Sequence, residues 1–122
     1  FALFVPLLPA RFGLGYAAVA LLATMVLHAV LGSNITTLSV AVPGLLAVGA
    51  GTAPILPLSF LVFTGICAHL VLPFHNVIFL LGEGSGRFDT KFLLRYTIPF
   101  TVVAFPAILF FYMGWWQLAG LL

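Results

Sequence analysis

The sequence predicts an all-α membrane protein, built from a re-entrant helical hairpin, one broken transmembrane helix and one long, kinked terminal transmembrane helix. Of its 122 residues, 64% are hydrophobic and only 5% are charged, whereas a typical soluble domain has roughly 25% charged residues. Apolar blocks follow one another along the chain, separated by short polar or proline-containing interruptions. Because backbone groups in lipid must be hydrogen-bonded within the protein, helices are the expected structure of these blocks.

The first predicted unit is a re-entrant helical hairpin over residues 13–49. Its first arm, residues 14–31, is an apolar block just long enough to cross a bilayer, which takes roughly 17–25 residues. An uncharged polar cluster follows, and the second arm, residues 37–48, is short for a span and contains Pro43. We expect a non-helical hairpin tip at residues 33–37. The alternative is an ordinary turn between two spans, with Ser and Thr side chains capping the helices.

A broken transmembrane helix is predicted over residues 55–81, and the terminal helix over residues 90–119. The apolar pattern of the broken helix stops at residues 73–76 and then resumes. Pro73 has no backbone N–H to donate to a helical hydrogen bond, so we expect the helix to be interrupted here, at membrane depth. The terminal block carries Pro99 and Pro106, which lie on nearly one helical face and are expected to kink the helix.

The charged residues predict how the chain is oriented in the plasma or inner membrane. Five of the six charged side chains lie within residues 83–95, where Arg87, Lys91 and Arg95 give a basic excess. Cytoplasmic loops are enriched in Lys and Arg, so the loop at residues 82–91 is expected on the cytoplasmic side. The basic side chains recur at every fourth position, which is typical of anchors at lipid headgroups. A net charge of +2 offers no basic surface for nucleic acid, and no nucleic-acid partner is expected.

The two interruptions contain the candidate binding residues. Non-helical backbone persists in a membrane only where it lines a cavity or contacts a ligand. The first interruption offers hydroxyl and amide groups beside a helix N-terminus, a combination that can hold an anion and a cation. The second offers an imidazole and an amide. The predicted substrate-binding residues are Ser33, Asn34, Thr36, Thr37, His75 and Asn76.

Three histidines and one cysteine are the other reactive side chains in the apolar blocks. His28, His69 and His75 do not have the spacing of a metal site, and no carboxylate accompanies them. For His28 and His69 we favour a neutral ring hydrogen-bonded between helices. His75 is left open between substrate contact or proton handling and helix capping. Cys67 is expected to be buried and inert, and no catalytic motif indicates an enzyme.

The order of these features resembles the C-terminal half of the divalent anion:sodium symporter family, which carries dicarboxylates, citrate and sulfate within the ion transporter superfamily. That family has a re-entrant hairpin tipped by Ser-Asn-Thr, followed by a helix broken at a Gly-Thr-Pro-Pro-Asn-like segment. Residues 33–37 and 72–78 look similar to these two places, and residues 86–89 to the basic loop before the last helix. Here Ile35 stands where the motif has threonine, and the proline segment is shortened to Phe74 and His75.

The resemblance implies a secondary active transporter of small di- or tricarboxylates or sulfate-like anions. Transport would be coupled to a cation gradient, with sodium as the expected cation. Ser33 and Asn34 would contact the sodium ion and the anion, and the backbone near Asn76 would complete a second ion site. The implied partners are the lipid bilayer, the remaining N-terminal part of the transporter and a second copy in a homodimer, with no further cofactor. The alternatives are a proton-coupled or exchange-type anion carrier of the same superfamily, and a non-transporting membrane subunit or anchor.

Overall fold

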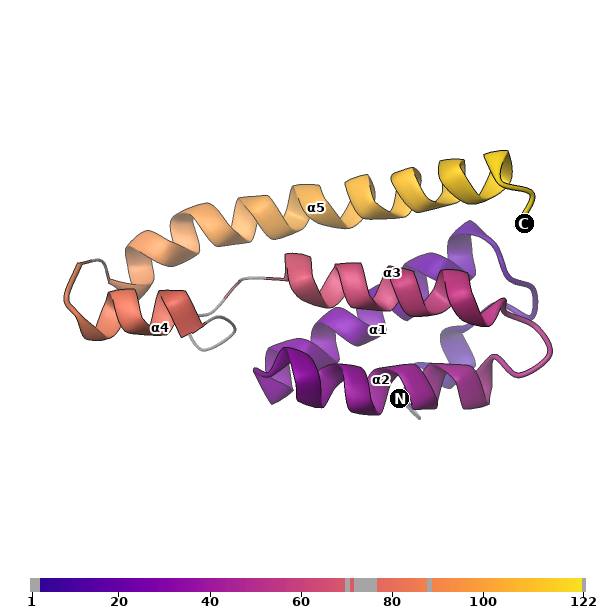
Figure 1. Ribbon diagram of the computed structural model, residues 1–122, viewed down its shortest axis with the longest axis horizontal. Coiled ribbons are helices and arrows are strands. Elements are labelled where there is room, and N and C mark those ends of the chain that lie inside the picture. The colour runs from indigo at the N-terminus through magenta and orange to yellow at the C-terminus, as the bar shows by residue number, and fades with distance from the viewer. Residues whose placement is uncertain (1–2, 70, 72–76, 88, 122) are drawn as a thin grey trace.

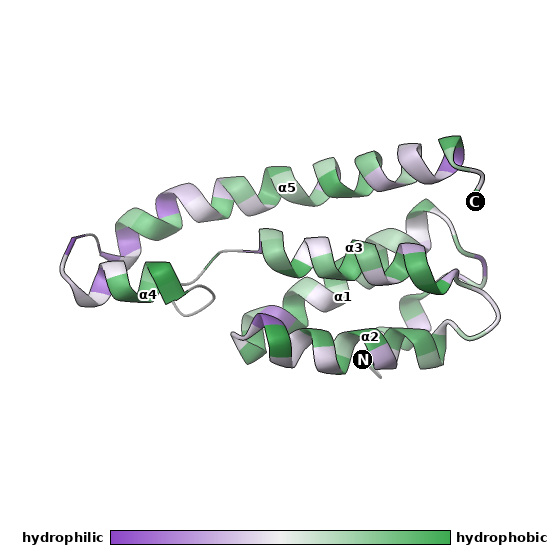
Figure 2. Cartoon of the chain, in the orientation of Figure 1, coloured by the Kyte–Doolittle hydropathy of each residue, from purple (hydrophilic) through white to green (hydrophobic). Residues whose placement is uncertain are grey.

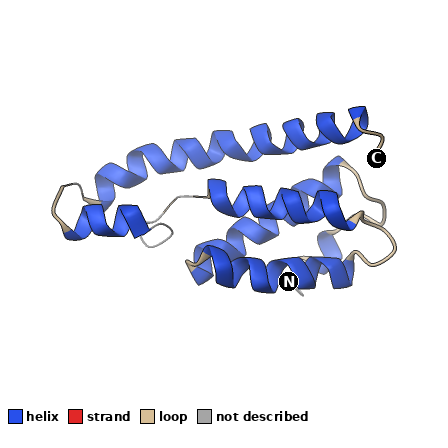
Figure 3. Cartoon of the chain, in the orientation of Figure 1, coloured by secondary structure: helices blue, strands red, loops and turns tan. Residues whose placement is uncertain are grey.

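The computed structural model describes residues 3–69, 71, 77–87 and 89–121. Within these ranges the chain is all-α, as predicted, and contains no strand (Figure 3). A short 3-10 helix, η1 (Val5–Leu7), precedes five α-helices. These are α1 (Leu14–Leu31), α2 (Asn34–Val48), α3 (Ile55–Ala68), α4 (Val77–Gly84) and α5 (Thr90–Leu118).

A two-residue turn joins α1 to α2 in a tight helical hairpin. Gly32 ends α1 with φ at 65°, and its N–H donates to the carbonyl of His28 at 2.8 Å. Glycine adopts this left-handed conformation without a Cβ penalty. Ser33 then caps α2, because its Oγ accepts the N–H of Thr36 at 3.4 Å. The prediction of a non-helical stretch at residues 33–37 is therefore wrong for all but Ser33, since the cap starts the helix at the next residue.

The helical structure is interrupted between α3 and α4. α3 ends at Ala68, earlier than the apolar block itself ends. Pro73 has no N–H to donate to the carbonyl of His69, four residues before it, and in a helix its ring would collide with that carbonyl. His69 is non-helical, and α4 begins at Val77. Residues 73–76, where the interruption was predicted, lie outside the described residues.

The last helix, α5, is continuous and curves along its length (Figure 1). Asp89 caps its N-terminus, with Oδ1 accepting the N–H of Phe92 at 2.7 Å. Pro99 and Pro106 both lie inside the helix. Each proline removes one intrahelical hydrogen bond, which bends a helix without ending it when the surrounding residues favour helix.

The central helix of the bundle is α3, which packs against α1, α2 and α5. α1, α2 and α3 alternate in direction, so the C-terminal ends of α1 and α3 lie at the same end of the bundle as the start of α2 (Figure 1). α1 and α3 approach so closely that a Cβ on Gly65 would lie 2.2 Å from Cδ1 of Leu21. Small residues permit such close helix packing in membrane proteins.

α3 and α4 lie one after the other along α5 (Figure 1). The hydroxyl groups of Thr64 in α3 and Tyr112 in the C-terminal half of α5 are 2.6 Å apart. α4 lies beside the N-terminal part of α5. His69, directly after α3, lines a groove together with Thr101 and Phe105, which lie on either side of the midpoint of α5. The end of α3 is therefore level with the middle of α5.

Two helices, α1 and α5, are long and apolar enough to cross a membrane, whereas α2 and α3 are apolar but shorter. Length and composition alone are weak evidence of membrane association. Hydrophobic residues occur along all five α-helices (Figure 2). Many large ones are exposed, including Phe110 and Phe111 at 65% and 68%. Cys67 is exposed as well, so the prediction of its burial is wrong. Apolar residues lie on every face of α3, so an apolar neighbourhood in the sequence does not show which face is buried.

Candidate functional site

Buried polar side chains gather where the α1–α2 turn meets the end of α3. His28 and Thr37 are 0% exposed and His69 is 6% exposed. Nδ1 of His28 lies 3.0 Å from Oγ1 of Thr37, which is the predicted interhelical hydrogen bond of this histidine. The ring centroids of His28 and His69 are 5.4 Å apart, with their planes at 68°. We call these three residues the histidine–threonine cluster.

Helix periodicity explains why the two histidines meet. On α1, Leu21 and His28 are two turns apart and therefore share a face. His69, which follows the last residue of α3, is four positions after Gly65, so it lies near the face that Gly65 occupies. The close approach of Leu21 and Gly65 consequently extends along the α1–α3 interface to the two rings.

The hydrogen bonds of Thr37 determine the tautomer of neutral His28. Oγ1 of Thr37 lies 2.7 Å from the carbonyl oxygen of Ser33, and a carbonyl can only accept, so the single hydroxyl proton goes there. Nδ1 of His28 must then be the donor in its contact with Thr37. The neutral ring therefore has its proton on Nδ1 and its lone pair on Nε2, which is a buried atom.

The other predicted binding residues of this turn lie just beyond the histidine–threonine cluster. Oγ of Ser33 accepts both the N–H of Thr36 and, at 3.1 Å, its hydroxyl. The amides of Asn34 and Ile35 come before the first intrahelical bond, so they have no acceptor inside α2. Oδ1 of Asn34 is buried and has no hydrogen-bond partner among the described residues. Ser33, Asn34 and Thr37 are thus grouped at the start of α2, with Thr36 exposed beside them.

The second half of the predicted site, His75 and Asn76, lies outside the described residues. The nearest described residue before it is Val71, whose carbonyl accepts the hydroxyl of Thr97 at 3.0 Å. Of the predicted sodium ligands, only Ser33 and Asn34 are described; they supply hydroxyl, amide and carbonyl oxygens. In the described ranges, no group of three or more His, Cys, Asp or Glu side chains could hold a metal ion.

A groove of about 390 Å³ lies beside the histidine–threonine cluster, between α1 and α5. Its lining is apolar apart from His69 and Thr101. Oγ1 of Thr101 is buried and has no hydrogen-bond partner in the part of the chain that the structure describes. His69 touches both this groove and His28, so it connects the buried cluster with the surface of the bundle.

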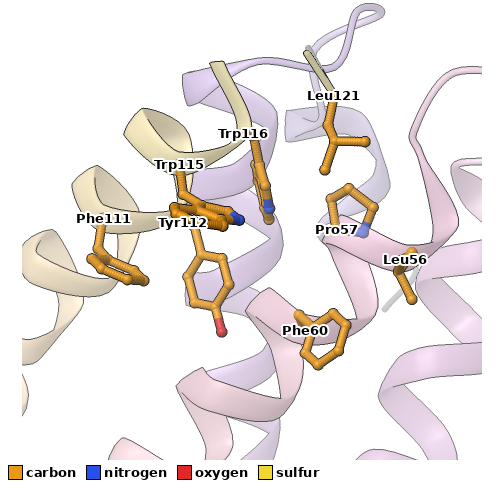
Figure 4. Close-up of a pocket in the computed structure, with 8 residues that line it drawn as sticks. All are labelled: Leu56, Pro57, Phe60, Phe111, Tyr112, Trp115, Trp116 and Leu121. Carbon is orange, nitrogen blue, oxygen red and sulfur yellow. The ribbon is translucent and has the colours of Figure 1, made fainter. Parts of the chain in front are cut away.

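An aromatic pocket of about 340 Å³ lies at the opposite end of α3 (Figure 4). It is lined by Leu56, Pro57, Phe60, Phe111, Tyr112, Trp115, Trp116 and Leu121. None of these side chains is charged, and the hydroxyl of Tyr112 is already bonded to Thr64. This pocket suits an apolar group, whereas the start of α2 suits a polar ligand and is the better candidate site.

The meeting of His28 and His69 was not predicted from the sequence. Taken alone, each histidine predicts only an interhelical contact, and 41 positions separate them. The signal lies in the order of the apolar blocks. Three consecutive antiparallel helices bring the C-terminal ends of the first and third together, and each histidine lies within one turn of such an end.

Comparisons of this chain with models of known protein families, with curated proteins and with solved structures find no match. What the chain does must therefore be inferred from its residues and their arrangement.

Proposed function

We propose that this chain is part of a secondary active transporter that carries small di- or tricarboxylates or sulfate-like anions, and that it holds half of the binding site. In this proposal α1 and α2 form a re-entrant hairpin, α3 and α4 together form one broken spanning helix, and α5 is a kinked spanning helix. The observation that carries the proposal is the position of the first turn of α2 and the end of α3. Both contact His28 at the end of α1, and His69 at the end of α3 is level with the middle of α5.

The dimensions of α5 support a site at membrane depth. The helix has 29 residues, or about 43 Å at 1.5 Å per residue, against roughly 30 Å for the hydrocarbon core of a bilayer. Thr101, beside His69, lies about 15 Å along the helix from Lys91 and about 21 Å from Trp115. With Lys91 at the cytoplasmic interface and Trp115 at the other, His69 lies near the centre of the membrane. In this arrangement the protein lies in the plasma or inner membrane, with the loop at residues 82–91 on its cytoplasmic side.

The start of α2 has the chemistry to hold an anion. The amides of Asn34 and Ile35 point out of a helix N-terminus, where the helix dipole adds a partial positive charge. A carboxylate or sulfate oxygen can accept these N–H groups, with the exposed hydroxyl of Thr36 nearby. The hydroxyl of Thr37 is buried and already bonded to Ser33 and His28, so in the proposal Thr37 positions the turn. In the proposal His75 contributes from the second interruption.

A coupling cation is needed because α1, α2 and α3 contain no Lys or Arg to balance an anion. Sodium is the cation that the family resemblance implies. In the proposal its ligands are Ser33, Asn34 and Asn76. The buried Oδ1 of Asn34 supports this assignment, since a buried acceptor without a partner among the described residues suits a cation.

A non-transporting membrane subunit or anchor is the second candidate. The local bonds of the turn favour it: Ser33 accepts from Thr36, and Thr37 donates to the carbonyl of Ser33. An ordinary capped turn has the same bonds and needs no ligand. The two candidates differ in Asn34, which takes no part in the capping bonds described above.

Uptake of labelled succinate, citrate and sulfate by the full-length protein in liposomes tests the proposal. Asn34→Ala is expected to abolish sodium-driven uptake while membrane insertion is unchanged. Gln117→Ala is the matched control, because it removes an exposed amide at the far end of α5 and is expected to keep wild-type uptake. Undiminished uptake by Asn34→Ala would remove this residue from the site. An absence of wild-type uptake under every imposed sodium or proton gradient would favour the anchor.

A further inference from the structure

The histidine–threonine cluster contains two ionisable rings in the interior of an otherwise apolar bundle. Burying an ionisable group at membrane depth is unfavourable by at least a few kcal/mol if it is charged, so such groups commonly mark ion or proton pathways. His28 and His69 are almost completely buried and in ring contact. A purely structural contact would be met as well by two apolar side chains, which have no polar atoms to satisfy.

The described helices packed around the pair carry few titratable groups. Besides the two histidines, the packed helices carry Tyr16 on α1, Cys67 on α3, and Lys91, Arg95, Tyr96 and Tyr112 on α5, whereas α2 carries none. Tyr16 is about 18 Å along α1 from His28, and Tyr112 is bonded to Thr64. The remaining four are exposed. No Asp or Glu lies on α1, α2, α3 or α5. These four helices therefore supply no carboxylate to the pair.

We infer that His28 and His69 together bind one proton, and that this proton enters the site with the transported anion. The inference rests on the proposed transport function. The proton comes from water and adds to the lone pair of one ring nitrogen, such as Nε2 of His28, so one N–H bond forms and no electrons are transferred. The resulting imidazolium supplies a full positive charge one turn from the start of α2, where the helix amides supply only a partial one.

The geometry limits the pair to one proton. Two charged rings 5.4 Å apart would repel each other strongly where water is scarce. The two histidines therefore titrate as a unit rather than independently. The bond from Nδ1 of His28 to Thr37 holds this ring in place and leaves Nε2 as its basic atom. His69 lines the groove beside α5, which makes it the member of the pair nearest to the bundle surface.

Nitrogen NMR of the full-length protein in lipid nanodiscs, with ¹⁵N-labelled histidine, tests the proton site without any transport measurement. The nitrogen shifts distinguish the two neutral tautomers from imidazolium, and His28→Gln and His69→Gln assign the signals. Near pH 8 the expected state of His28 is the neutral ring with its proton on Nδ1. Toward pH 5, with sulfate or succinate present, the pair is expected to show one imidazolium, which disappears in either Gln variant. The inference is overturned if both rings stay neutral throughout, or if both become imidazolium.

Uptake at constant sodium concentration on both sides of the liposome membrane, with an imposed inward proton gradient, tests the coupling role. Wild-type uptake is expected to accelerate, and His28→Gln and His69→Gln are expected to lose the acceleration. If uptake follows sodium alone and both Gln variants match the wild type, the inference fails and the proposed function stands. If no gradient drives uptake of any anion, the proposed function fails, and the coupling role fails with it.

Discussion

The close approach of α1 and α3 at Gly65 allows a quantitative test of the packing that brings the two histidines together. In Gly65→Ala the new Cβ would lie 2.2 Å from Cδ1 of Leu21, whereas carbon atoms at optimal separation are about 3.5–4.0 Å apart. The Leu21 methyl must therefore retreat by more than about 1 Å. Leu21 is 0% exposed and packs in a cluster with residues of α1, α3 and α5, so its retreat displaces other buried side chains.

The expected magnitude combines two opposing effects. Inserting a methyl group into a well-packed core costs about 1–3 kcal/mol. Replacing glycine by alanine within a helix stabilises the helix by about 1 kcal/mol. Gly114→Ala in α5 is the matched control, since it has the same helix effect and a Cβ there meets nothing within 4 Å. We expect Gly65→Ala to be less stable than Gly114→Ala by about 1–3 kcal/mol.

Reversible unfolding in mixed detergent micelles, followed by tryptophan fluorescence, measures this difference. Leu21→Ala alone should destabilise by about 2–5 kcal/mol. The double variant with Gly65→Ala should lose less stability than the sum of the two single losses, because Leu21→Ala removes the methyl group that the new Cβ would meet. Equal stability of Gly65→Ala and Gly114→Ala would refute the close α1–α3 packing, and with it the physical basis for the His28–His69 contact.

Two further substitutions test the elements that position the site. Ser33→Ala removes the cap of α2 and is expected to lower the free energy of unfolding by about 1 kcal/mol. Ser39 is exposed in the same helix, so Ser39→Ala should change this free energy by less than about 0.5 kcal/mol. Equal effects of the two substitutions would argue against the cap. Thr64→Val removes the 2.6 Å contact with Tyr112 and should cost about 0.6–1.5 kcal/mol. Tyr112→Phe should cost a similar amount, and the double variant little more, whereas full additivity would show that the two hydroxyls are not bonded.

The sequence predicts the helices best where a long apolar block ends at a residue with a clear local effect. α1 has the predicted ends, since the apolar block stops directly before Gly32, which takes the left-handed conformation. The start of α2 was predicted too late. Ser33, Asn34 and Thr36 favour both turns and helix N-termini, and only the geometry shows that Ser33 caps. The end of α3 was also misplaced, since the helix ends at Ala68 whereas the apolar block continues to Leu72.

The candidate site was only partly predictable from the sequence. The polar residues at the α1–α2 turn are recognisable, because they interrupt an apolar run without any charge. That His28 lies between this turn and the end of α3 depends on how three helices pack, which no local sequence pattern predicts. The burial of Thr37 beside His28 follows from that packing, as does the contact of His28 with His69. For the same reason the exposure of Cys67 was not foreseen, because an apolar neighbourhood in sequence does not distinguish the packed face of a helix from the lipid face.

The central claim is that the start of α2 contacts a transported anion, and thiol labelling at Thr36 tests it most directly. Thr36 is exposed, so Thr36→Cys in a Cys67→Ser background gives one reporter at the site within this chain. Thr52→Cys, in the exposed turn between α2 and α3, is the control. We predict that succinate, citrate or sulfate, together with the coupling cation, slows labelling at position 36 by a membrane-impermeant reagent and leaves position 52 unchanged. Labelling at position 36 that is equally fast with and without every anion and cation would contradict the claim.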